Sequence, residues 1–135
     1  MESLTSYVKV IQSVSPLSVA SGGAAETAIS CIGFDRADHI INVGTVEHTV
    51  CTSVTASIWE SATTGGTYTL ISGTLTTINS AGGAVAISGP VATAKPWQKA
   101  ISTANAGWAV FSAVAILYNG SGKIPKTQEL TATVV

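Results

Sequence analysis

The stretch that decides the fold is WAVFSAVAILY, residues Trp108–Tyr118. Its side chains alternate between two faces with the period of two that is typical of a β-strand. One face carries Trp108, Val110, Ser112, Val114, Ile116 and Tyr118, and the other carries Ala109, Phe111, Ala113, Ala115 and Leu117. A strand that is apolar on both faces is protected from water on both. We therefore expect it to be central in its sheet, covered on both sides, or buried in a contact between subunits.

A second long strand is predicted from Val50 to Glu60, where β-branched and small residues also alternate. Shorter strands are expected between glycine-rich turns such as Ser21–Gly23, since glycine adopts the positive φ of tight turns. They are Tyr7–Ser13, Thr27–Ile32, His39–Val43, Thr67–Ser72, Leu75–Ile78, Ala84–Ser88 and Gln128–Val134. About eight or nine strands with this spacing predict an all-β fold, an antiparallel β-sandwich of jelly-roll-like form.

The segment Pro96–Asn105 is the one candidate for a helix, and its helical pattern is weak. Its start, Ala94–Trp97, looks more like an irregular crossing segment between strands. The sequence therefore predicts almost no helix.

A single domain over residues 1–135 is expected for a chain of this length. Residues 1–26 are interpreted as an N-terminal arm plus the first strand, and residues 119–135 as a C-terminal tail strand. Both ends are thus expected to extend from the core. The C-terminal strand either completes the chain's own sandwich or adds to the sheet edge of a neighbour.

Charged residues make up only 10% of the chain, against about 25% in an ordinary soluble domain. Hydrophobic residues make up 46%, and counting adds 16 Ser and 18 Thr. This composition argues against intrinsic disorder and against a coiled coil. With a net charge of -1 and scattered basic residues, no nucleic-acid partner is expected. A surface so poor in charge resists aggregation only when much of it is buried in an assembly.

No membrane partner is expected, because the longest apolar run, 106–118, is shorter than the roughly 20 residues of a spanning helix. The start MESLTS lacks the regions of a secretory signal, so we expect synthesis and folding in a cytosol. Cys31 and Cys51 are then expected to be reduced and buried, without a disulfide.

Few side chains suit catalysis. Asp35, Asp38 and His39 lie close in sequence, and Glu47 and His48 follow after a turn, but their spacing matches no metal site. We interpret these residues as solvated loop charges. No Gly-x-Ser-x-Gly nucleophile elbow is present in the sequence. We therefore expect no enzyme activity, no catalytic residue, no metal and no cofactor.

The aromatic residues from which a sugar-binding platform could be built are Trp59, Trp97, Trp108, Tyr68, Tyr118, Phe34 and Phe111. Core packing is the favoured interpretation for Trp59 and Trp108, because both lie inside predicted strands. Trp97 lies outside a predicted strand and is the best candidate for an exposed anchor. Lys95 and Lys99 beside it fit a solvated loop. The candidate interface residues are Trp97, Val114, Ile116 and Tyr118.

Two stretches carry a family resemblance: GFDRADHIINVG, residues 33–44, and SIWESATTGGTYTLISG, residues 57–73. They combine an apolar strand ending in Asn-x-Gly, an Ile-x-Glu-Ser strand, a glycine hairpin and an Ile-Ser-Gly strand. The apolar strand Ala109–Tyr118 completes the pattern. Over about residues 30–120 the chain resembles small virion structural proteins of tailed bacteriophages, the capsid cement or decoration proteins.

The resemblance implies a β-sandwich or jelly-roll-like fold, homotrimers on the icosahedral lattice and no catalysis. We therefore expect a protein made in the host cytoplasm that binds the major capsid protein on the capsid exterior and stabilises the shell. The alternatives are another virion component, such as a head spike base, tail or adaptor protein, or a carbohydrate-binding β-sandwich used for attachment. An exposed aromatic row would favour sugar binding, and a flat uncharged subunit contact would favour cement.

Overall fold

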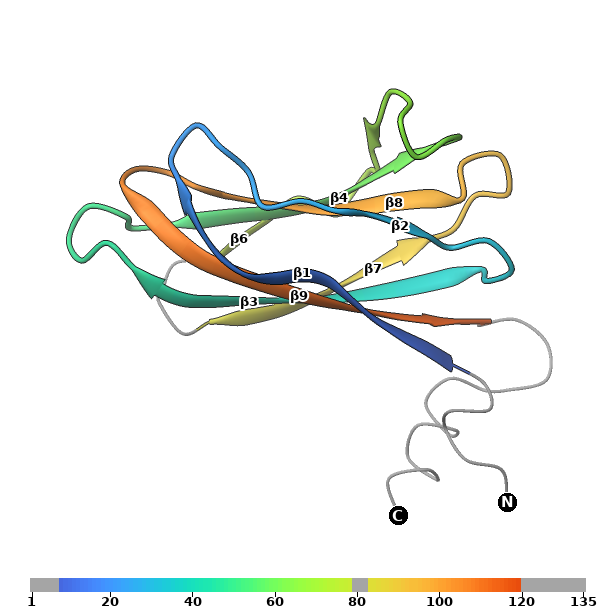
Figure 1. The fold of residues 1–135 in the computed structure, drawn as a ribbon, viewed down its shortest axis with the longest axis horizontal. Helices are drawn as coiled ribbons and strands as arrows, with labels where there is room; N and C mark the ends of the chain where they lie inside the picture. Colours follow the sequence, from blue (N-terminus) through green and yellow to red (C-terminus); the bar gives the residue numbers. More distant parts are fainter. Residues whose placement is uncertain (1–7, 79–82, 120–135) are drawn as a thin grey trace, which may run out of the picture.

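The protein folds as a sandwich of two antiparallel β-sheets (Figure 1), as the sequence predicts. The computed structural model describes residues 8–78 and 83–119. Its strands are β1 (Val8–Ala20), β2 (Ala28–Ser30), β3 (Arg36–Val46), β4 (Val54–Ser61), β5 (Thr69–Leu70), β6 (Thr76–Ile78), β7 (Ala84–Pro90), β8 (Trp97–Ala104) and β9 (Trp108–Tyr118). These described residues form no helix, and so none that could span a membrane.

The strand order is that of a jelly roll. One sheet has the order β1-β9-β3-β7, and the other has β2-β8-β4-β5, with β6 also paired to β4. The antiparallel pairs are nested: β1 pairs with β9, β2 with β8, β3 with β7, and β4 with β5 and β6. The chain is therefore one long hairpin, doubled back at the β4–β5 connection and rolled into two sheets.

Strand β9 is central, as predicted, with β1 on one side and β3 on the other. Its inward residues, Ala109, Phe111, Ala113, Ala115 and Leu117, are at most 2% exposed. Its outward residues are only half-buried. Within the described residues, the core covers one face of β9 and leaves the other partly open.

The core between the sheets combines a few large side chains with many alanines. Phe111 and Ile41 come from the first sheet and Ile58 from the second, and each is at most 1% exposed. Alanines on β4, β8 and β9 fill the space around them. Packing of this kind excludes water from the inner faces and leaves the outer faces free to differ.

Residues 94–96 lie in the irregular connection between β7 and β8, as expected. The weak helix candidate Pro96–Asn105 forms strand β8 instead, so that expectation is wrong. Its residues alternate between buried and half-buried. Its buried positions include the polar Gln98 and Ser102, which hide the apolar alternation that marks a strand. Trp97 is the first residue of this strand rather than a loop residue.

Several other boundaries differ from expectation; β3, for example, spans Arg36–Val46 rather than His39–Val43. Strand β1 continues past Ser13 to Ala20, with register shifts on either side of Val14. Pro16 is tolerated because β1 is an edge strand and the missing N–H breaks no ladder bond. Strand β4 begins at Val54 rather than Val50. The predicted strand Gln128–Val134 lies outside the described residues.

The two cysteines are free and buried, as expected.

Core packing predicts that truncating a buried isoleucine costs far more stability than truncating an exposed one. Ile58→Ala is expected to lower the free energy of unfolding by about 2–5 kcal/mol, because it opens a cavity between the sheets. Ile32→Ala is the matched control: Ile32 is 65% exposed, and its truncation is expected to cost less than about 0.5 kcal/mol. Urea denaturation followed by circular dichroism measures both, and equal losses would contradict this packing.

Candidate functional site

The outer side of the first sheet carries an apolar surface. On β9, Val114, Ile116 and Tyr118 point outward because the residues between them are buried. Strand register places Ile40 of β3 beside Val114 and Val10 of β1 beside Ile116. Val10 is 62% exposed. We call these five residues the apolar face; three of the four predicted interface residues belong to it.

Asp38 lies opposite Ile116 within the apolar face, and one hydrogen bond ties its carboxylate to the Tyr118 end. The Tyr118 hydroxyl donates to Oδ2 of Asp38 at 2.9 Å. Partial burial, together with this bond and the negative charge of Asp38, raises the pKa of Tyr118 to about 12. The phenol is therefore protonated at neutral pH and remains a donor. Arg36, the register partner of Tyr118 on β3, brings a positive charge to the same end.

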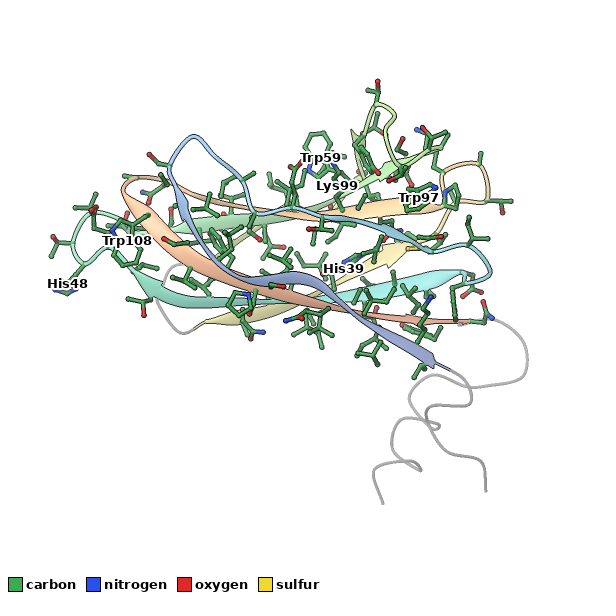
Figure 2. The ribbon with its side chains drawn as sticks, viewed as in Figure 1. His39, His48, Trp59, Trp97, Lys99 and Trp108 are labelled. Atoms are coloured by element: carbon green, nitrogen blue, oxygen red, sulfur yellow. The ribbon has the colours of Figure 1, made fainter. Side chains whose placement is uncertain are left out.

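The fourth predicted residue, Trp97, lies on the other sheet. Its side chain points away from the core, because neighbouring residues of a strand face opposite sides and the next residue, Gln98, is buried. Register places Lys99 of β8 opposite Trp59 of β4, and Trp97 opposite Ser61. Figure 2 shows Trp59 projecting from the outer side of this sheet, with Lys99 beside it. Trp59, Trp97 and Lys99, with Tyr68 from the β4–β5 connection, form what we call the aromatic face.

Polar contacts hold two of the three rings of the aromatic face, those of Trp59 and Tyr68. Lys99 Nζ lies 4.3 Å from the centre of the Tyr68 ring and 3.0 Å from Oε1 of Glu26. The Tyr68 hydroxyl donates to the carbonyl oxygen of Thr64 at 2.9 Å. Trp59 Nε1 donates to Oγ of Ser57 at 2.9 Å. These contacts hold the rings in place through their edges and through one cation.

Two expectations about this region are wrong. Trp59 and Trp108 do not pack in the core; both are half-buried on outer faces, on opposite sheets. Lys99 does not lie in a solvated loop but inside β8, where its side chain is 21% exposed. A pattern of alternation shows that two positions share a face, but it does not show whether that face is the inner or the outer one.

The expectation of solvated loop charge is also wrong for His39, which is fully buried between the sheets. Its Nε2 lies 2.8 Å from Oε1 of Gln98. The Gln98 amide nitrogen donates to the carbonyl oxygens of Gly89 and Pro90, so its oxygen is the acceptor and His39 carries its proton on Nε2. A Cβ on Gly89 would lie 2.7 Å from that oxygen, so a larger residue there would force the Gln98 side chain to shift.

Burial lowers the pKa of His39, and it outweighs the opposing effects of the Gln98 hydrogen bond and the charge of Asp38. A second proton would go to Nδ1, which has no hydrogen-bond partner among the described residues. The ring is therefore neutral and its role is structural. In the described part of the chain, no group of three His, Cys, Asp or Glu residues could hold a metal.

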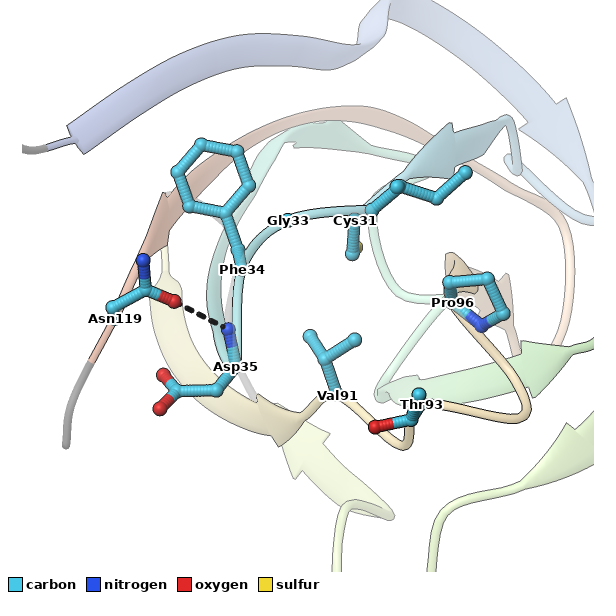
Figure 3. Close-up of a pocket in the computed structure, with 9 residues that line it drawn as sticks. Cys31, Gly33, Phe34, Asp35, Val91, Thr93, Pro96 and Asn119 are labelled. Carbon is cyan, nitrogen blue, oxygen red and sulfur yellow. Dashed lines mark hydrogen bonds between the residues drawn. The ribbon is translucent and has the colours of Figure 1, made fainter.

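A pocket of about 500 Å³ opens at one end of the sandwich (Figure 3). It is lined by Cys31, Ile32, Gly33, Phe34, Asp35, Val91, Thr93, Pro96 and Asn119. The backbone N–H of Asp35 donates to Oδ1 of Asn119 at 3.0 Å. Burial raises the pKa of the Cys31 thiol to about 11, so the thiol is protonated at neutral pH and a weak nucleophile.

No family model matches the sequence, and no curated protein matches it. Solved structures resemble the fold. A GH115 4-O-methyl-α-glucuronidase with specificity for decorated arabinogalactans is 13% identical with a TM-score of 0.48, over 87% of this chain and 17% of that chain. A chain of infectious bursal disease virus Gx strain is 10% identical with a TM-score of 0.41, over 86% of this chain and 33% of that one.

A third resemblance is to Eiger TNF from S. frugiperda, which is 6% identical with a TM-score of 0.38, over 91% of this chain and 92% of that one. The chain thus spans about a sixth of the length of the glucuronidase and a third of the viral chain. Identities this low bear on the fold alone.

The buried His39 predicts a loss of stability in acid. The unfolded chain takes up a proton at the ordinary pKa of 6.5, whereas the folded protein does so only at a lower pH. The contribution of His39 to the free energy of unfolding is therefore complete above pH 6.5. It is lost as the pH falls from 6.5 to the pKa of the folded state, by at most about 1.4 kcal/mol per pH unit.

Urea denaturation at about pH 7.5 and about pH 5.5 measures this loss. His39→Gln is expected to reduce it, because glutamine can keep a hydrogen bond to Gln98 but does not titrate. His48→Gln removes an exposed histidine and is expected to leave the loss unchanged. A pH dependence that is the same in His39→Gln and in the unsubstituted protein would refute this assignment.

Proposed function

We propose that this β-sandwich is a non-enzymatic structural protein of a bacteriophage virion, a capsid cement protein that binds the outer surface of the shell. The observation that carries the proposal is the apolar face. It gathers Val114, Ile116 and Tyr118 with Val10 and Ile40 on the outer side of a continuous sheet. The bacteriophage assignment itself rests on the sequence resemblance over about residues 30–120.

A second copy of the chain is the proposed occupant of the apolar face. A chain with 10% charged residues has few means of keeping such a surface solvated, and burial against itself removes it from water. Closed symmetry achieves this without new residues, because each patch is reused by rotation. Obligate interfaces of this type are apolar and bury 2,000 Å² or more. Three copies suit the local three-fold axes of an icosahedral shell.

At the β1 edge of the first sheet, contact through the face is favoured over contact through strand pairing. Edge strand β1 is interrupted by two register shifts and contains Pro16. Bulges and proline disfavour the addition of another strand along an edge.

The proposed mechanism is clamping. A cement trimer that bridges neighbouring copies of the major capsid protein adds contacts that must break before the shell opens under internal pressure. Because the protein binds the assembled shell and not its separate parts, it shifts the assembly equilibrium by mass action. No step of this mechanism requires a catalytic side chain.

Charge on the apolar face is expected to break the trimer and leave the fold intact. Val114→Glu or Ile116→Glu places a carboxylate where the proposed contact would bury it unpaired, at a cost of several kcal/mol. The mass in solution measured by light scattering should then fall from three times the chain mass of 13.6 kDa to the mass of one chain. Thr63→Glu is the control, because Thr63 is exposed in the β4–β5 connection.

Circular dichroism establishes that each variant keeps its strands. An unsubstituted protein that is a stable monomer in solution and also sits singly on the particle, without three-fold contacts, would refute the proposed assembly.

Copy number separates cement from the other virion roles of such a module. Mass spectrometry of purified particles is expected to give a number of copies comparable to that of the major capsid protein. A few copies per particle would instead indicate a vertex, tail or adaptor component.

A further inference from the structure

We propose that the aromatic face binds a neutral carbohydrate chain, whose sugar rings stack on Trp59 and Trp97. This site is on the opposite sheet from the apolar face and does not depend on the capsid role. It would make the protein an adhesive module as well as a structural one.

The first argument is the concentration of aromatic rings on one sheet. The chain has only eight aromatic residues, three Trp, three Tyr and two Phe, and three of them meet on this face. Trp59 and Trp97 stand on adjacent strands, two register positions apart, which is a diagonal spacing within reach of large side chains. A pyranose sugar suits such a site, because the side of its ring that carries a row of C–H groups stacks on aromatic rings.

The second argument is the polar chemistry among the rings. Lys99 pairs with Glu26 at 3.0 Å, so a donor and an acceptor for sugar hydroxyls lie beside each other. Lys95 Nζ, 3.2 Å from Oγ1 of Thr69, adds another donor near the same loop. Because the charge of Lys99 is already balanced by Glu26, the cluster suits a neutral sugar better than an anion.

The third argument is preorganisation. The hydrogen bonds from Trp59 to Ser57 and from Tyr68 to Thr64 hold these two rings before any ligand arrives, which reduces the entropy lost on binding. Figure 1 shows the β4–β5 connection, which contains Tyr68, rising from the outer side of the sheet. It borders the aromatic face on one side.

The centre of the cluster argues against a protein partner. Cores of protein interfaces are depleted of charged residues, yet Lys99 lies in the middle, opposite Trp59, two residues from Trp97 and over the Tyr68 ring. Covering it would cost the hydration of an ion pair. A sugar hydroxyl can instead replace water at both charges.

Isothermal titration calorimetry of the full chain with cellohexaose, mannohexaose and chitohexaose tests the site. At least one of these sugars is expected to bind, with a dissociation constant between micromolar and millimolar. Trp59→Ala and Trp97→Ala are each expected to weaken binding at least tenfold, which is about 1.4 kcal/mol. Trp59→Phe should retain part of the affinity, because it keeps a stacking ring.

Trp108→Ala is the matched control: it removes a half-buried tryptophan from the opposite sheet and should leave sugar binding unchanged. Circular dichroism checks that each variant is folded. The proposal is overturned if none of the three sugars binds, or if Trp108→Ala weakens binding as much as Trp59→Ala. It is also overturned if Trp59→Ala changes the oligomeric mass, since the aromatic face would then be a subunit contact.

Discussion

The constraint on which the structure depends is the burial of β9 in the centre of its sheet. An apolar strand of 11 residues is disfavoured at an edge, because one side of its backbone would keep unpaired N–H and C=O groups. Pairing with β1 on one side and β3 on the other satisfies the backbone, and the second sheet covers its inner face. Since β1 and β9 lie at opposite ends of the described chain, closing this pair places Val8 opposite Tyr118. The nested pairs β2–β8 and β3–β7 follow from that closure.

The buried pair of His39 and Gln98 joins the two sheets by a hydrogen bond, at a point where the core is polar rather than apolar. His39 comes from β3 in the first sheet and Gln98 from β8 in the second, and Gln98 also bonds to the carbonyl oxygens of Gly89 and Pro90 on β7. This arrangement pairs His39 Nε2 with the Gln98 oxygen and the Gln98 nitrogen with two carbonyl oxygens, and turning the Gln98 amide over would break these bonds. It fixes the register of β3, β7 and β8 more narrowly than alanine packing does.

The sequence predicts those parts of the fold in which chemistry and pattern agree. Strand β9 is recognisable because every inward position is apolar, and the turns because glycine concentrates there. Strand β8 is not recognisable, because Gln98 and Ser102 occupy inward positions and their partners belong to other strands. For the same reason the burial of His39 could not be foreseen: its partner Gln98 lies 59 residues away in the chain. The outward placement of Trp59 depends on which face of β4 meets the other sheet, and periodicity alone does not decide that.

The two proposed sites lie on the outer faces of opposite sheets, so both can be occupied at the same time. The sheets of a sandwich face opposite directions, so whatever covers the apolar face on the first sheet leaves the aromatic face on the second pointing away from the contact. Neither face constrains the core, because the inward residues of both sheets are already buried against each other. An assembly built through Val114 and Ile116 would therefore display one set of Trp59 and Trp97 per copy on its outside. Repetition of a weak sugar site on one particle raises the avidity for a surface that carries many sugars far above the affinity of each site.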